Sequence, residues 1–271
     1  MTRKIGFTLT TPTTPSEEPT YTKTPEPKAP RKSVVQVFFA ERNRRLTYYN
    51  DQFDLHPGDV VYVSGMLEGL RGRVTEVNYN FKIRVADYHR VIAVADTKVK
   101  GKFHMAGSHF VTFDPVTLPI DKVRTWFMAP AKEEEEYASG NDDAEFSLDN
   151  LRGMNVSTTI ADRGQDYYTE NRVRYVCVDG NKGYAIVTGT HPYEVEFEYD
   201  NGVIRNLVCS CFCSYTCKHE VATMLQLRET LNLIAEHYEE EYADTGYFAA
   251  IYKGTFFENV IGGMEKGSFV M

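Results

Sequence analysis

The sequence has no long apolar segment. Its apolar runs are only a few residues long, whereas a helix that crosses a bilayer needs about 20 apolar residues. The N-terminal stretch MTRKIGFTLTTPTTP also lacks the apolar core of about 7–15 residues on which a secretory signal depends. We therefore expect no transmembrane helix, no membrane partner and a cytoplasmic location.

Signatures of catalysis are also missing. The sequence contains no Gly-x-x-x-x-Gly-Lys-Ser/Thr phosphate loop and no Gly-x-Ser-x-Gly nucleophile elbow. A nucleophilic pair of Cys217 and His219 would need an orienting third group and a substrate cleft, which a crowded cysteine segment does not offer. We predict that the protein is not an enzyme, with no catalytic residue, no organic cofactor and no small-molecule substrate.

Basic residues are fewer than acidic residues over the whole chain, but not in its first half. The formal net charge is −8; residues 1–130 carry 19 Lys/Arg against 13 Asp/Glu, and residues 131–271 carry 11 against 25. An asymmetry of this kind is typical of an interacting arm or an acidic tail, and the basic end here is the first half. The basic residues near aromatic ones in this half are Arg42, Arg44, Arg45, Arg71, Arg73, Lys82, Arg84 and Arg90. Positive charge beside stacking rings is typical of single-strand binders, although such rings can equally fill a core.

Composition and periodicity predict an α+β protein built from several segments. Short strands separated by glycine-marked turns, such as 60–63 and 81–85, indicate a small barrel-like domain. In the second half, apolar alternation predicts strands at 193–199 and 203–208, followed by a helix over about 217–241. The predicted segments are a disordered Thr/Pro-rich tail (1–32), a mostly-β barrel-like domain (33–130), an acidic linker (131–146), a zinc-stapled sheet-plus-helix domain (147–245) and an unassigned C-terminal segment (246–271).

Four of the five cysteines fall within nine residues, at Cys209, Cys211, Cys213 and Cys217. In a chain without an export signal, this density indicates a metal site rather than disulfides. A Cys-x-Cys pair at the end of a strand and a Cys-x-His pair at the start of a helix together complete a tetrahedron, and sulfur-rich ligands favour zinc. Because protein atoms fill all four positions, we expect one structural Zn²⁺, and we expect loss of a ligand to unfold this domain.

The arrangement Cys-x-Cys…Cys-x-His before a helix resembles the SWIM zinc finger. The similarity covers about residues 151–228 and includes an upstream Arg-Gly (163–164), a Tyr pair (167–168) and a Gly-Thr-x-x-Tyr-Glu-Val run (189–195). The ligands that this resemblance implies are Cys209, Cys211, Cys217 and His219, in a ββα fold. Two departures are Phe212, where the family usually has proline, and Cys213, an extra thiol that could replace Cys209 or Cys211.

Two hypotheses for function follow. SWIM-type proteins are generally DNA-binding or protein-interaction modules, so the resemblance implies an accessory factor that binds nucleic acid, with DNA favoured over RNA. The alternative is a protein–protein adaptor that uses the zinc module. Residues 151–228 carry eight basic and nine acidic residues, and Glu194, Glu196 and Glu198 lie on one strand face, where they would repel phosphates.

Overall fold

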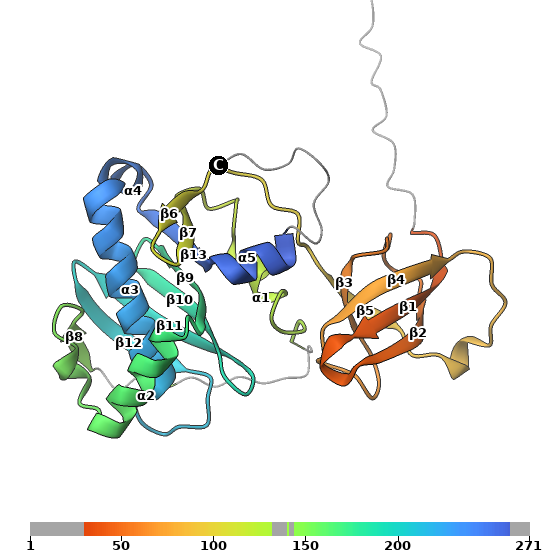
Figure 1. Ribbon diagram of the computed structural model, residues 1–271, viewed down its shortest axis with the longest axis horizontal. Coiled ribbons are helices and arrows are strands. Elements are labelled where there is room, and N and C mark those ends of the chain that lie inside the picture. The colour runs from red at the N-terminus through yellow and green to blue at the C-terminus, as the bar shows by residue number, and fades with distance from the viewer. Residues whose placement is uncertain (1–29, 132–139, 141–143, 261–271) are drawn as a thin grey trace, which may run out of the picture.

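The structure described here is a computed structural model covering residues 30–131, 140 and 144–260. It is an α+β protein with two antiparallel sheets, which lie side by side in Figure 1. The predicted tail (1–32) and acidic linker (131–146) fall mostly outside the described residues, as do residues 261–271.

The smaller sheet has five strands in the order β2-β1-β4-β3-β5. Its core forms because β1 alternates, so that Val35, Val37 and Phe39 are fully buried between half-exposed neighbours. The strands are β1 (Ser33–Phe39), β2 (Arg44–Asn50), β3 (Val60–Val63), β4 (Gly72–Asn78) and β5 (Val91–Ala95).

This sheet is not the closed barrel that the sequence predicted. Among the described residues, outer strand β2 does not pair with outer strand β5; Tyr49 of β2 forms an isolated bridge with Arg90, just before β5, and its N–H donates to the carbonyl of His89. The predicted strand at 81–85 is also wrong. Residues 81–84 have no regular structure, and Val85–Asp87 form the 3-10 helix η2. The side chains of residues 81–84 do alternate between half-buried and exposed, as predicted. However, this segment pairs with none of the described strands.

The larger sheet has eight strands in the order β6-β7-β13-β9-β10-β11-β12-β8. Strands β11 and β12 confirm the two strands predicted around residues 193–208. The bounds are β6 (His104–Ala106), β7 (His109–Thr112), β8 (Glu145–Ser147), β9 (Val173–Asp179), β10 (Lys182–Thr188), β11 (Pro192–Asp200), β12 (Val203–Cys209) and β13 (Tyr247–Tyr252).

The larger sheet draws strands from both sides of the acidic segment. β6 and β7 precede that segment, and β13 comes from the region that the sequence analysis left unassigned. β13 pairs with β7 on one side and β9 on the other. It reads as a continuous apolar run, YFAAIY, because both of its faces are covered.

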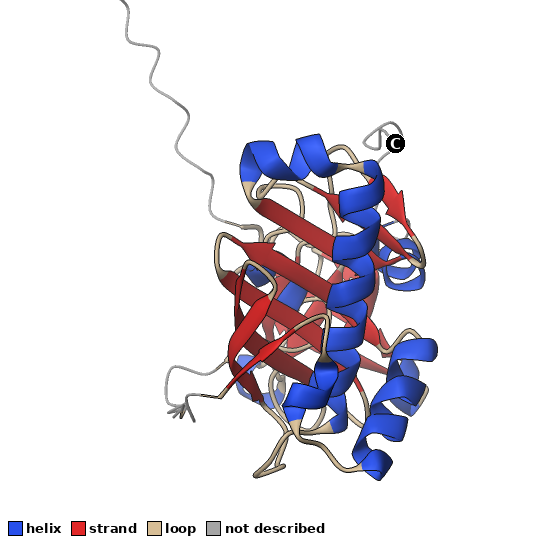
Figure 2. Ribbon diagram, turned by 90° about the vertical axis from the view of Figure 1, so that its left-hand side faces the viewer, coloured by secondary structure: helices blue, strands red, loops and turns tan. Residues whose placement is uncertain are grey.

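Two helices cover one face of the larger sheet, as Figure 2 shows. α3 (Lys218–His237) buries Val221, Met224 and Leu227 in the core, and α2 (Thr158–Thr169) packs against it. The close approach depends on Gly164, because a Cβ there would lie 2.4 Å from Cγ1 of Val221. The helix predicted over 217–241 ends earlier than expected, since the acidic run begins a separate helix, α4 (Glu239–Thr245).

A second core joins the other face of this sheet to the smaller sheet. It contains Val60 from the smaller sheet, Tyr175 from the larger one, and Trp126 and Phe256 from the segments between them. Helices α1 (Ile120–Arg124) and α5 (Lys253–Val260) lie in this region, between the two sheets in Figure 1. The remaining 3-10 helices are η1 (Ala40–Arg42) and η3 (Leu151–Met154).

Among the helices of the described residues, none combines the length and apolar character that a bilayer crossing requires.

Candidate metal centre

The structure brings together all four residues that the SWIM resemblance implied as ligands. One ligand atom from each of Cys209, Cys211, Cys217 and His219 lies within 4.8 Å of the others. Cys209 ends strand β12, and Cys217 is the N-cap residue of α3. The group could therefore hold one metal ion between the hairpin and the helix.

The spacing of the donor atoms fits a tetrahedral zinc ion. His219 Nδ1 lies 3.7 Å from Sγ of Cys209 and 3.6 Å from Sγ of Cys217. Zn–S bonds of about 2.3 Å and Zn–N bonds of about 2.0–2.1 Å give an S···N edge of about 3.6 Å in a tetrahedron. When bound, a closed ion of this kind supplies cross-linking of the fold rather than an open site for water.

Each of the three sulfurs also accepts a backbone N–H. The amide of Cys211 donates to Cys209, that of Cys213 donates to Cys211, and that of Glu220 donates to Cys217; each bond lowers the pKa of the accepting thiol. Desolvation acts in the opposite direction and raises the pKa of Cys211 to about 11. The amides thus favour the thiolate that a metal needs, in a setting where burial favours the thiol.

The start of α3 holds the Cys-x-His pair in place. The carboxylate of Glu220 accepts a hydrogen bond of 2.6 Å from the backbone N–H of Cys217, which closes a capping box around that thiol. The hydrogen bond from Cys209 lowers the pKa of Cys217 and raises that of Cys209 itself. Cys217 is therefore the first of the two to be a thiolate.

Aromatic rings fix the plane of the His219 imidazole. Tyr193 stacks on it with ring centroids 4.2 Å apart, and Tyr167 meets it edge-on at 5.4 Å. Its Nε2 is buried and has no hydrogen-bond partner among the described residues. Gly189 makes room for this stack, since a Cβ there would lie 2.9 Å from the Tyr193 ring.

The remaining residues of the ligand loop point outward. Cys213 is exposed and is not among the four clustered residues, so the structure does not use it in place of Cys209 or Cys211. Phe212 is fully exposed and Tyr215 is 70% exposed. The loop therefore presents two aromatic rings to solvent.

Three of the eight basic residues predicted for this surface make internal contacts, and the other five are exposed. Arg71 donates to the carbonyl of Trp126 and pairs with Glu258, and Arg73 donates to the carbonyl of Gly58. Arg90 pairs with Asp51. By contrast, Arg42, Arg44 and Arg45, at the end of the β1–β2 hairpin, are exposed. Tyr48 and Tyr49 are buried, so these two rings serve the core.

Sequence reasoning missed Tyr193, Tyr167 and Gly189 as functional positions around the imidazole. In the sequence they are only part of the SWIM-like pattern, because their contacts to His219 depend on the pairing of β10 with β11 and on where α2 packs. It also missed a cavity between the two sheets that is lined by Arg71 and Arg174.

Comparisons with known proteins identify no family. No protein-family model matches the chain, and no solved structure matches it. The chain is 33% identical over 92 residues to uncharacterized protein MJ1493 of Methanocaldococcus jannaschii. That alignment covers 34% of this chain and 38% of the relative, so the chain spans well under half of that protein.

Fold and site together define the class: an α+β protein with two antiparallel sheets and a Cys3His cluster that could hold one metal ion. No named relative assigns it a partner.

Proposed function

We propose that this is a non-catalytic, cytoplasmic zinc protein of the SWIM type that binds single-stranded nucleic acid, with DNA as the preferred strand. The zinc assignment rests on the sulfur-rich donor set and the 3.6–3.7 Å S···N distances. A cytoplasmic location suits a site built from three reduced cysteines.

The nucleic-acid assignment rests on one row of the smaller sheet. Phe38 of β1 pairs with Arg45 of β2 on one side and with Arg73 of β4 on the other. Residues that face each other across antiparallel strands project from the same side of the sheet. The half-exposed Phe38 thus lies between two arginines of the same face, of which Arg73 also donates to the carbonyl of Gly58. The guanidinium of Arg45 is the exposed one, and exposed Arg42 adds positive charge at the hairpin end. Arg44 pairs with buried Phe39 and therefore belongs to the opposite face.

This row suits a strand whose bases are unpaired. A base can stack on Phe38 while its phosphates contact Arg45, and stacking on an aromatic side chain is worth about 1–3 kcal/mol per base. The side chain of Arg45 has no recorded carboxylate partner among the described residues, so it can contact a phosphate without first breaking an ion pair.

Fluorescence anisotropy tests the proposal. The zinc-loaded protein is titrated into a labelled single strand of about 16 nucleotides, into a duplex of the same sequence and into the matching RNA, at several salt concentrations. We expect the tightest binding to single-stranded DNA. Phe38→Ala should weaken it by about 5- to 150-fold, and Arg45→Ala should reduce the salt slope by about 0.7.

Two variants serve as matched controls. Arg205→Ala removes an exposed arginine of the larger sheet that pairs with Glu145, and Phe212→Ala removes the exposed ring beside the metal. Neither should change binding by more than about twofold. An absence of binding to all three strands, or equal losses in the Phe38 and Phe212 variants, would refute the proposed surface.

The adaptor function is the second candidate, and the exposed rings of Phe212 and Tyr215 favour it. Aromatic side chains with few internal contacts are common anchors of protein interfaces. If no strand binds, a pull-down with the zinc-loaded protein, compared with a Phe212→Ala and Tyr215→Ala double variant, is the experiment to perform. A partner lost only from the double variant would support this function.

A further inference from the structure

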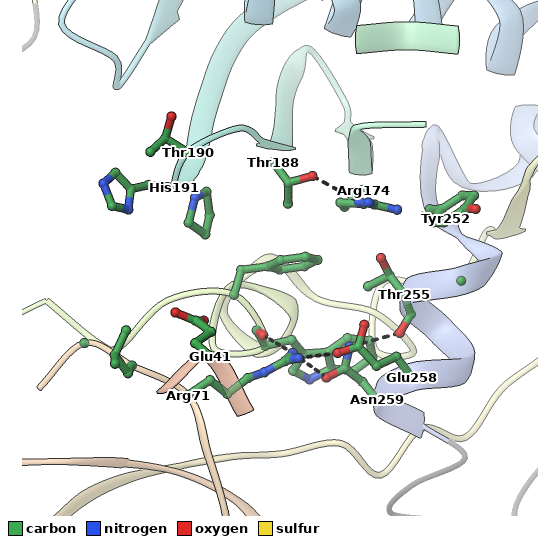
Figure 3. Close-up of a pocket in the computed structure, with 16 residues that line it drawn as sticks. Glu41, Arg71, Arg174, Thr188, Thr190, His191, Tyr252, Thr255, Glu258 and Asn259 are labelled. Carbon is green, nitrogen blue, oxygen red and sulfur yellow. Dashed lines mark hydrogen bonds and ion pairs between the residues drawn. The ribbon is translucent and has the colours of Figure 1, made fainter. Parts of the chain in front are cut away.

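A cavity of about 520 Å³ lies between the two sheets, apart from both the metal centre and the Phe38 row. Its walls come from β9, β10 and β13 of the larger sheet, from α5, and from the segment around Arg71 of the smaller sheet. This volume is within the range of small-molecule sites, about 300–1,000 Å³. Figure 3 shows Arg174, Thr188 and Tyr252 on one side and Arg71, Glu258 and Asn259 on the other.

The charge of Arg174 is not neutralised by any carboxylate of the described residues. Its Nε donates to Oγ1 of Thr188 at 3.1 Å, and its guanidinium lies 4.8 Å from the centroid of the Tyr252 ring. These two contacts hold the side chain in position. Among the residues that the structure describes, no carboxylate lies within ion-pair distance of it, and no acceptor is recorded for its two terminal nitrogens. A fixed, partly buried cation without a counter-ion favours an anionic ligand.

The opposite wall does not supply that counter-ion. Glu258 is paired with Arg71, which also donates to Oδ1 of Asn259 at 2.9 Å. Glu41 also lines the cavity, and its side chain is exposed. The charge available to an incoming anion is therefore that of Arg174. The hydroxyl of Thr188 already donates to the carbonyl of Arg172 at 3.3 Å and serves to hold Arg174, and Thr255 lines the cavity from α5.

The cavity also has an apolar part, made by Leu70, Phe127 and Pro192. A guanidinium in one part of the cavity and apolar side chains in another suit a ligand that has a phosphate and a flat ring. We propose that this cavity binds a nucleotide through its phosphate monoester, with the phosphate on Arg174 and the base against Phe127. The nucleotide is either free or the phosphorylated end of a nucleic-acid strand.

This inference is separate from the proposed strand-binding surface, since Arg174 lies in the larger sheet and Phe38 in the smaller one. The chain offers a local reporter for it. Trp126 is the only tryptophan of the sequence, is buried at the cavity wall and accepts a hydrogen bond from Arg71 through its carbonyl. A ligand that shifts Phe127 or Arg71 should change its fluorescence.

Calorimetric titration of the zinc-loaded protein, with Trp126 fluorescence as a second readout, tests the site. The probes are AMP, adenosine, inorganic phosphate, and one oligonucleotide with either a 5′-phosphate or a 5′-hydroxyl. We expect AMP or the 5′-phosphorylated strand to bind more tightly than its unphosphorylated counterpart. Arg174→Ala should weaken that binding by about 10- to 150-fold, and Thr188→Val, which frees the guanidinium to move, should weaken it less.

The variants decide the outcome. Arg205→Ala removes the same charge elsewhere and should bind as the wild type does, and Phe38→Ala should leave AMP binding unchanged. Binding of AMP alone identifies a free nucleotide, whereas binding of the 5′-phosphorylated strand alone identifies a strand end; both support the site. The proposal is overturned if neither binds, if adenosine binds as well as AMP, if phosphate binds as tightly as AMP, or if the Arg174 and Arg205 variants lose affinity equally.

Discussion

Removal of the metal should unfold the ligand loop while most of helix α3 stays docked. The buried face of α3 changes the expectation drawn from the sequence, in which the whole domain depended on zinc. Four large side chains of this helix are buried in the core: Val221, Met224, Leu227 and Ile234. At about 1.5–3 kcal/mol each, they contribute about 6–12 kcal/mol that does not depend on the metal.

Metal binding adds a stabilising free energy of comparable size, but it acts locally. With free zinc at about 1,000 times its dissociation constant, binding stabilises the folded state by about 4 kcal/mol. For a chain of this size, that corresponds to a fall in Tm of about 8–16 °C when a chelator removes the metal. The affected region is the loop from Cys209 to His219, where the metal would hold together sulfur and nitrogen atoms that lie 3.6–3.7 Å apart.

Calorimetry and hydrogen exchange, with and without chelator, measure these effects. Amide protection should be lost across 209–219 and kept across 224–237. His219→Ala should reproduce the chelated state, and His237→Ala, which removes an exposed histidine of the same helix, should not. A Tm that chelation leaves unchanged would contradict the metal assignment, and loss of protection throughout α3 would contradict the burial argument.

Three further predictions concern the core. Desolvation lowers the pKa of buried His109 to about 4, from an ordinary value near 6.5. As the pH falls, the unfolded state therefore binds a proton before the folded state does. The free energy of unfolding should decrease by about 3 kcal/mol between pH 6.5 and pH 4. Chemical denaturation across that range should show a flatter profile in His109→Gln. Arg71→Ala removes the hydrogen bonds to the carbonyl of Trp126 and to Asn259 of α5; it should cost about 2 kcal/mol and shift the tryptophan fluorescence, with exposed Arg45→Ala as the control. Gly164→Ala should cost about 1–3 kcal/mol, and Val221→Ala in the same chain should recover part of that loss, as measured by urea unfolding.

The parts of the fold that could be predicted are those with local signals. β11 alternates glutamates with apolar residues, and β12 leads directly into the cysteines, so strand, turn and metal ligands follow from neighbouring residues. β13 carries an equally clear apolar run, but its partners β7 and β9 lie far away in the sequence. No local sequence pattern indicates which distant strands will pair, and so the centre of the larger sheet could not be predicted.

The sequence also could not predict which individual basic residues are exposed and which make internal contacts. Arg45 and Arg71 look alike in the sequence, yet Arg45 is exposed and Arg71 donates to the carbonyl of Trp126 and to Asn259 of α5. The difference arises because Trp126 and Asn259 reach Arg71 from segments distant in the chain. A basic residue is available to a partner only after such internal acceptors have been identified.

One turn connects the metal centre with the cavity between the sheets. Gly189 N–H donates to the carbonyl of His191 at 2.9 Å in the short connection from β10 to β11. On one side of this turn, Gly189 contacts the stack of Tyr193 on His219; on the other, Thr190 and His191 line the cavity. We therefore expect a metal bound to the imidazole to order one wall of the cavity as well.

This arrangement predicts coupling between the two sites. Because coupling free energies are reciprocal, nucleotide bound in the cavity should tighten metal binding by the same factor by which metal tightens nucleotide binding, about fivefold or more. Competition with a chromophoric chelator, with and without AMP, measures the first factor, and calorimetry of metal-free and metal-loaded protein measures the second. Gly189→Ala, which presses on the Tyr193 ring, should reduce both together. Unequal factors, or a loss confined to one site in this variant, would show that the turn does not link them.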